Sequence, residues 1–118
     1  MSSPTSRTLA KLRAAGYMAE VVEKWNRFAR KRNDLFQFID VLAVNGDEVL
    51  GVQTTSAANT SARIKKICGL QSADSWLVSP HRRIVVHGWA KRGPRGKRKL
   101  WTCIETEITP DQIQPEEK

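Results

Sequence analysis

Residues 35–55 read LFQFIDVLAVNGDEVLGVQTT and predict a β-hairpin. The first ten of these residues, 35–44, are nearly all apolar, which is typical of a strand buried on both faces. The dipeptide Asn45-Gly46 is the strongest short signal for a tight hairpin turn. Residues 47–55 then form the returning strand, so this stretch supplies two neighbouring strands of a sheet.

Asp40 lies in the middle of the apolar strand, where an ionised carboxylate is costly unless it is paired, hydrogen-bonded or bound to metal. A two-residue turn would place Asp40 opposite Gly51, which leaves room for an ion or a water molecule. Because side chains alternate along a strand, one face would then carry Asp40, Gln53 and Thr55. A three-residue loop would bring Thr54 to that face instead. A structural cap or a buried arginine partner is the alternative role for Asp40.

The remaining sequence predicts helices and strands on both sides of this hairpin. A helix over residues 4–15 is expected to begin at Ser3 or Thr5 and to end at Gly16. Further elements are strands over 17–25, 83–91 and 99–108, a basic connector over 26–34, a helix from Asn59 or Thr60 to Gly69, and a helical turn over 72–78. The order α-β-β-β-α-β-β predicts a single α/β domain, residues 1–108, with a mixed central sheet flanked by helices. Residues 109–118 are expected to be an acidic, flexible tail.

The charge distribution predicts a polyanionic partner. The chain has a net charge of +8, and residues 1–101 alone carry 19 basic and 7 acidic side chains. Such a field attracts nucleic acid, whose phosphates can be held without reading the base sequence. The basic residues form two clusters: Arg27, Arg30, Lys31 and Arg32 in the connector, and Lys91, Arg92, Arg95, Lys97, Arg98 and Lys99 in a glycine-containing loop. The alternative for the second cluster is a solvated hairpin tip.

Other sequence features predict an intracellular, cytoplasmic protein that does not cross a membrane. Cys68 and Cys103 form no metal-binding pair, which favours a reducing compartment. Residues 1–7 lack the apolar core of a signal peptide, and no apolar run has the roughly 18 residues that a membrane helix needs. The four tryptophans are interpreted as core or dimer contacts rather than as platforms on which bases stack.

The segment Phe38-Ile39-Asp40-Val41, followed by the turn and residues 51–55, resembles the D-x(n)-(D/E/Q)-x-K core of the PD-(D/E)XK nuclease superfamily. Residues 9–53 are similar to archaeal Holliday junction resolvases and their phage-encoded relatives. The resemblance implies a restriction-endonuclease-like fold. It also implies Mg²⁺ or Mn²⁺ held by Asp40, Gln53 and the Thr54 carbonyl.

The catalytic residues implied by the resemblance depart from the family pattern at three places. Gln53 is neutral where the family usually has an acid, and Thr55 stands where the family has lysine. A cation on the following helix would replace that lysine, with Lys65 as the first candidate beside Lys66 and Arg63. Glu23, and less so Glu20, would replace the glutamate that resolvases carry on their first helix.

The resemblance implies a metal-dependent DNA endonuclease that hydrolyses phosphodiester bonds in duplex or branched DNA, and it is compatible with a homodimer. The alternative is a DNA-binding module that keeps the nuclease fold and has lost catalysis. A basic structural or RNA-binding protein of unrelated fold is a third reading, favoured only by the charge.

Overall fold

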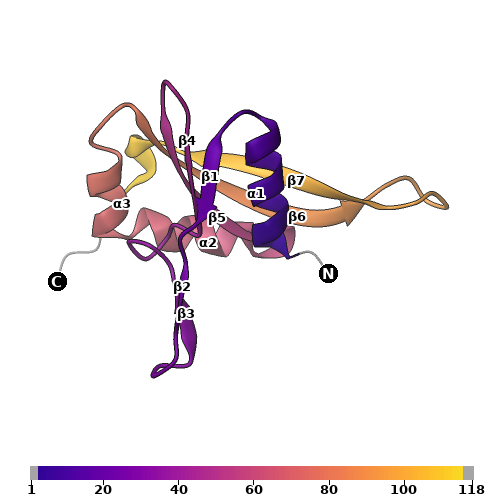
Figure 1. Cartoon of the computed structure of the whole chain (residues 1–118), viewed down its shortest axis with the longest axis horizontal. Helices are drawn as coiled ribbons and strands as arrows, with labels where there is room; N and C mark the ends of the chain where they lie inside the picture. Colours follow the sequence, from indigo (N-terminus) through magenta and orange to yellow (C-terminus); the bar gives the residue numbers. More distant parts are fainter. Residues whose placement is uncertain (1–2, 116–118) are drawn as a thin grey trace.

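The computed structural model describes residues 3–115, which form one α/β unit around a mixed five-stranded sheet (Figure 1). The strand order is β1-β4-β5-β6-β7, and only the β5–β6 pair is parallel. The strands are β1 (Met18–Val21), β4 (Val41–Val44), β5 (Val49–Ser56), β6 (Arg82–Arg92) and β7 (Leu100–Ile108). The helices are α1 (Pro4–Ala14), α2 (Thr60–Cys68) and α3 (Gln71–Trp76), with 3-10 turns η1 (Ala57–Asn59) and η2 (Pro110–Gln112). The predicted mixed sheet flanked by helices is therefore confirmed.

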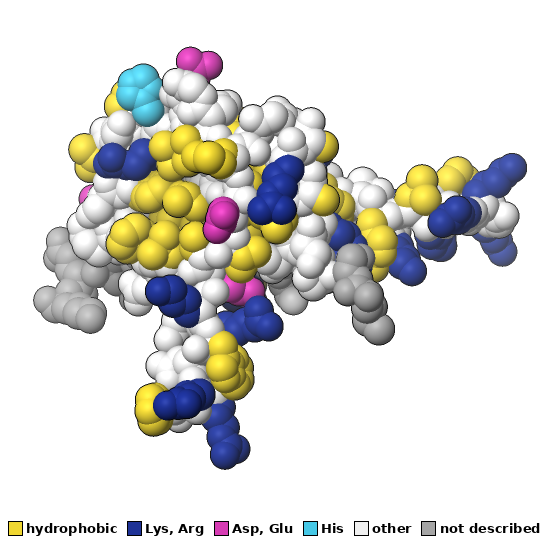
Figure 2. Space-filling view, in the orientation of Figure 1, with side chains coloured by type: hydrophobic (Ala, Val, Ile, Leu, Met, Phe, Trp, Pro, Cys, Tyr) yellow, Lys and Arg dark blue, Asp and Glu magenta, His cyan; other side chains and the backbone are white. Residues whose placement is uncertain are grey.

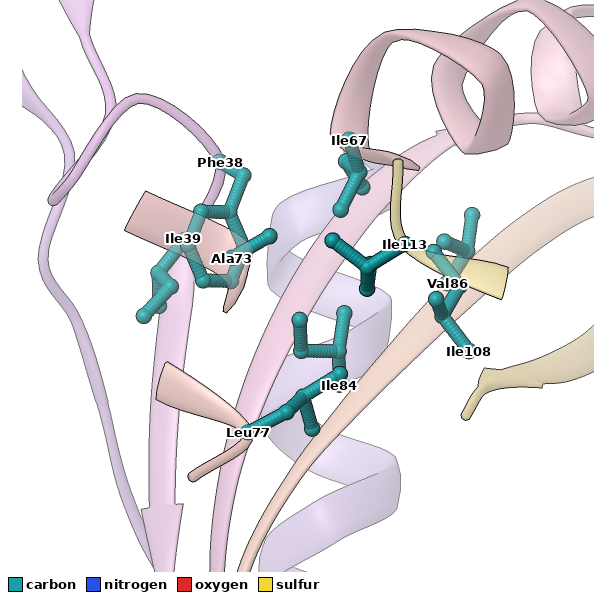
Figure 3. Close-up of a cluster of buried hydrophobic side chains, with 9 residues drawn as sticks. All are labelled: Phe38, Ile39, Ile67, Ala73, Leu77, Ile84, Val86, Ile108 and Ile113. Carbon is teal, nitrogen blue, oxygen red and sulfur yellow. The ribbon is translucent and has the colours of Figure 1, made fainter. Parts of the chain in front are cut away.

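The sheet has a buried cluster on each face. On the face covered by α1, Leu12 packs with strand residues that include Val41, Val52 and Val85. On the opposite face, the side chains of α2 and α3 meet those of β6 and β7 (Figure 3); the buried members of this cluster are Phe38, Ile39, Ile67, Ala73, Leu77, Ile84, Val86, Ile108 and Ile113. These two clusters hold the ends of β4 and β5 in fixed positions.

Helix α1 is also tied to the sheet by a buried polar network. Thr8 Oγ1 lies 3.1 Å from His87 Nδ1 and accepts a hydrogen bond of 2.9 Å from Trp89 Nε1. All three side chains are buried. The helix begins where the sequence predicts, because Ser3 Oγ accepts a hydrogen bond from the Ser6 amide at 3.1 Å.

The prediction of one continuous strand over residues 35–44 is wrong for its first half. Residues 35–39 fold back on themselves, with the Ile39 amide donating to the Leu35 carbonyl at 2.9 Å. Phe36 and Gln37 adopt positive φ angles of 53° and 76°, which ends any strand. The turn places both Phe38 and Ile39 in the same core cluster. Alternation along a strand would have sent neighbouring side chains to opposite faces.

The predicted β4–β5 hairpin exists, but its register differs by two residues from a tight Asn45-Gly46 turn. The loop is stabilised by Asn45 Oδ1, which accepts hydrogen bonds from the amides of Asp47 and Glu48 at 2.8 and 2.9 Å. Gly51 therefore pairs with Leu42 rather than with Asp40. A Cβ on Gly51 would lie 2.9 Å from Ile39 Cδ1, so a larger residue at this position would require the Ile39 side chain to shift.

The predicted strand over residues 17–25 is interrupted. After β1 the chain leaves the sheet and forms a separate two-stranded hairpin, β2 (Lys24–Asn26) with β3 (Lys31–Asn33). We call residues 24–33 the β2–β3 arm. It projects from the body of the molecule, as does the β6–β7 tip, residues 91–99, in another direction (Figure 1).

The beginning of the expected flexible tail is packed against the body. Ile113, after η2, is buried in the core, and the Gln114 amide donates to the Cys68 carbonyl at 2.8 Å. An apolar side chain in an otherwise polar segment explains this packing. Residues 116–118 of the tail lie outside the described residues. Within residues 3–115, no helix has the length and apolar character needed to cross a membrane.

Candidate metal and nucleic-acid site

A polar cavity of about 340 Å³ lies where several elements end close together. Asp40 directly precedes β4, and Gln53 and Thr54 lie near the end of β5. The first turn of α1 and the middle of α2 complete the walls. The lining residues are Pro4, Thr5, Glu23, Arg32, Asp34, Asp40, Gln53, Thr54, Arg63 and Lys66.

Asp40 and Gln53 lie on the same side of the sheet, as the sequence predicts, and they also contact each other directly. Asp40 Oδ2 accepts a hydrogen bond of 2.6 Å from Gln53 Nε2 and another of 2.9 Å from the Thr54 amide. The exposed fractions of Asp40 and Gln53 are only 4% and 2%. The shared face survives the corrected register because a shift of two residues does not change the side on which a strand residue projects.

Two further carboxylates join Asp40. Glu23, Asp34 and Asp40 each offer a carboxylate oxygen, and these oxygens all lie within 4.8 Å of one another. Glu23 reaches the cluster because the adjacent Val22 amide donates to the Asp40 carbonyl at 2.9 Å. Glu23 therefore lies next to Asp40. It must lie there if it is to replace the glutamate that resolvases carry on their first helix.

Asp34 is a site residue that the sequence interpretation missed. It is placed beside Asp40 by the fold-back turn over residues 35–39, and Gln53 Nε2 lies 3.4 Å from its Oδ2. The only sequence signal was a second carboxylate six residues before Asp40. In an extended strand, two carboxylates six residues apart would not meet. The spacing therefore indicates a shared site only once the turn is known.

The protonation of Asp40 depends on its burial and on the carboxylates beside it. Burial and a side-chain hydrogen bond with Asp34 raise the pKa of Asp40 from 3.8 to about 8, although the Thr54 amide lowers it. A negative charge at Asp40 is thus costly when no cation is close. A divalent cation among the three carboxylates would remove that cost.

The donor set fits a hard divalent cation. Mg²⁺ and Mn²⁺ prefer carboxylate, amide and water oxygens. The carboxylates of Glu23, Asp34 and Asp40 lie close enough together to bind one such ion. Gln53 adds an amide group whose Oε1 is buried and has no hydrogen-bond partner among the residues that the structure describes. A buried polar oxygen without a partner calls for one, which an ion or a water molecule in the cavity can supply.

The expected cation on the second helix is present, but at different positions from the first candidate. Arg63 and Lys66 line the cavity, whereas Lys65 lines a separate depression with Ala62 and Gly69. Arg32 adds a third cation, since its guanidinium forms a 2.8 Å ion pair with Glu23.

Thr55 differs from the pattern that the resemblance implies, because it is buried, does not line the cavity and carries no charge that could replace a lysine. Thr54 lines the cavity and donates its amide N–H to Asp40. The role of its carbonyl as a metal ligand stays a prediction. The Thr54 hydroxyl lies 3.0 Å from that of Thr5 on α1, which fixes the wall between helix and sheet.

The predicted nucleic-acid residues divide between the two projections. Arg27, Arg30, Lys31 and Arg32 lie on the β2–β3 arm, and all six cations of residues 91–99 lie on the β6–β7 tip. All ten are exposed, and both projections show lysine and arginine at their surfaces (Figure 2). The interpretation of the tryptophans holds for Trp89, which is buried. It is wrong for Trp25 and Trp101 as core residues, because both are exposed.

Comparison with protein-family models, with curated proteins and with solved structures gives no match. The functional assignment therefore depends on the geometry and chemistry of the cavity and on the charge of the surfaces around it.

Proposed function

We propose that this protein is a metal-dependent nuclease that hydrolyses phosphodiester bonds in DNA. The observation that carries the proposal is the cluster of Glu23, Asp34 and Asp40, with oxygens within 4.8 Å, beside the unsatisfied amide oxygen of Gln53. Carboxylates gathered in a cavity with cations at its wall are suited to binding a metal ion together with a phosphate.

The order of the elements supports the proposal. Helix α1 is followed by β1, β4 and β5 as an antiparallel series, then by α2 and the parallel strand β6. When the inserted β2–β3 arm and α3 are left out, this order agrees with the α-β-β-β-α-β order that the resemblance to PD-(D/E)XK nucleases implies. Asp40 directly precedes the second strand of this series and Gln53 lies on the third, near the positions where that family places its first two metal ligands.

Asp40, Asp34 and Glu23 would hold Mg²⁺ or Mn²⁺. Gln53 turns its Nε2 toward Asp40 and Asp34 in the metal-free site, so its amide would have to flip to offer its oxygen as a fourth protein ligand. When bound, such an ion polarises a phosphate and lowers the pKa of a water molecule that attacks it. Arg63 and Lys66 face the same cavity and would bind phosphate oxygens and stabilise the added negative charge of the transition state. They supply the positive charge that Thr55 lacks.

The test measures metal binding and cleavage separately. Isothermal titration with Mn²⁺ should detect a site in the wild type that is lost in Asp40→Asn and weakened in Asp34→Asn. Supercoiled plasmid and a four-way junction should be cleaved by the wild type with Mg²⁺ or Mn²⁺ and not by Asp40→Asn. Asp47→Asn is the matched control, because Asp47 is an exposed carboxylate in the β4–β5 loop. An Asp40→Asn variant that binds Mn²⁺ and cuts as the wild type does would refute the assignment.

A DNA-binding module that has lost catalysis is the second candidate function. It is favoured by the neutral Gln53 and by Thr55 at the position of the family's lysine. It predicts that the wild type binds DNA through its two projections and leaves both substrates intact at any Mg²⁺ or Mn²⁺ concentration. The cleavage assay therefore separates the two candidates directly.

A further inference from the structure

Two exposed aromatic rings stand on the β2–β3 arm, where they add nothing to the core. Trp25 is 62% exposed and Phe28 is 89% exposed. Burial of a large aromatic ring is strongly favourable, so rings left in water on a projecting element indicate a contact surface. The backbone that carries Phe28 is fixed, because Asn26 Oδ1 accepts hydrogen bonds of 3.0 Å from the amides of both Phe28 and Ala29.

The charge of the arm selects the kind of partner. Its charged side chains are all positive and all exposed: Lys24, Arg27, Arg30, Lys31 and Arg32. The Arg27 guanidinium lies 5.3 Å from the centre of the Phe28 ring, so cation and ring form one surface. A second copy of this chain would bring the same five cations against these, and like charges repel. Cations interleaved with exposed rings suit a single nucleic-acid strand, whose bases stack while its phosphates pair with the charges.

Trp25 lies on the same face of the arm as Arg32, a residue that lines the cavity. In the β2–β3 pair it stands directly opposite Arg32, and directly opposite side chains project from the same face. Arg32 lines the cavity and contacts Glu23. The arm is also joined to the carboxylate cluster at both ends, since Glu23 directly precedes it and Asp34 directly follows it.

We propose that the β2–β3 arm binds unpaired bases of a DNA strand by stacking them on Trp25 and Phe28. The cations of the arm hold the phosphates of that strand, and the strand leads into the cavity along the face shared by Trp25 and Arg32. This inference rests on the proposed function and names its substrate class, which is DNA with unpaired bases. Bases inside a duplex already stack on each other, so a duplex can use the cations but not the rings.

The test is a binding titration in EDTA, so that cleavage plays no part in the result. The probes are a fluorescein-labelled oligo(dT) of about 12 nucleotides, which spans a typical single-strand site, and a blunt duplex of the same length. Trp25→Ala should weaken oligo(dT) binding about 5- to 100-fold and duplex binding less than about twofold. Trp25→Phe keeps a ring and should restore the oligo(dT) affinity. Stacked bases should quench the tryptophan fluorescence of the wild type, and this variant should lose the part of the quenching that comes from Trp25.

Met18→Ala is the matched control, because Met18 is an exposed apolar side chain on β1, outside the arm. Its affinity for both probes should equal that of the wild type. Circular dichroism and urea unfolding check that each variant is folded. Phe28→Leu, which removes the ring and keeps an apolar side chain, gives a second measurement at the tip of the arm.

Equal losses for oligo(dT) and duplex, or an unchanged oligo(dT) affinity in Trp25→Ala, would overturn the proposal. The two proposals fail in different ways. If oligo(dT) binding depends on Trp25 but no DNA is cleaved with Mn²⁺, only the nuclease function fails. If DNA is cleaved but oligo(dT) binding does not depend on Trp25, only the stacking inference fails.

Discussion

Replacing Asp40 with asparagine should stabilise the metal-free protein at high pH. Asparagine has the shape of a protonated aspartic acid, and its side-chain oxygen can accept the hydrogen bonds that Asp40 accepts from Gln53 and Thr54. Its amide can donate toward Asp34, as a protonated Asp40 does. The variant therefore keeps the contacts of the site and removes the negative charge that crowds against Asp34 and Glu23.

The sign and size of the effect follow from the pKa of Asp40. The pKa of Asp40 rises from 3.8 to about 8 on folding. At pH values between these two, Asp40 is therefore protonated in the folded protein and ionised in the unfolded chain. The stability of the wild type must then fall as the pH rises through this window. The difference corresponds to an upper bound of about 6 kcal/mol. We expect about 2 kcal/mol, since the cavity admits water, which lowers the cost of a charge at Asp40.

The assay is urea unfolding of both proteins in EDTA, followed by tryptophan fluorescence at about pH 5 and about pH 9. The variant should gain about 2 kcal/mol over the wild type between the two pH values. With Mn²⁺ at about 100 times its dissociation constant, the wild type should gain about 2.7 kcal/mol and the variant nothing. A stability difference that is the same at both pH values would refute the reasoning, because it would mean that the Asp40 charge is not crowded.

Three other outcomes are expected. Lys66→Ala should reduce the rate of DNA cleavage at least about tenfold in a plasmid assay, while Lys65→Ala, outside the cavity, should leave it unchanged. Replacing three cations of the β6–β7 tip together should lower the slope of log affinity against log salt by roughly 2 to 3 in anisotropy titrations on duplex DNA, the residues being Arg95, Lys97 and Arg98. Ile113→Ala should destabilise the fold by about 2–4 kcal/mol in urea unfolding, whereas a freely mobile tail would give no change.

Much of the sheet could be predicted from local sequence, because its signals are local. Strands β6 and β7 are long apolar-rich segments separated by a glycine-containing loop, and α1 has a cap and a terminating glycine. The common face of Asp40 and Gln53 was also predictable. The predicted register was wrong by two residues, but an even shift keeps every side chain on its side of the sheet.

The complete site could not be predicted from local patterns. An apolar run reads equally as a buried strand or as a buried turn, and here residues 35–39 are a turn that carries Asp34 to Asp40. Which cation of α2 reaches the cavity depends on how the helix is rotated about its own axis relative to β5. Adjacent lysines point in different directions, so only the packed structure separates Lys66 from Lys65.

The buried contact of Thr8 with His87 and Trp89 also constrains how the chain folds as it is made. These partners are about 80 residues apart, so α1 leaves the ribosome long before β6 exists. An isolated helix of 11 residues is marginal in water, and closing so long a loop is slow. Helix α1 should therefore dock late, after β5, β6 and β7 have paired, and until then the Val41–Val52 face of the sheet remains open to chaperones and to aggregation.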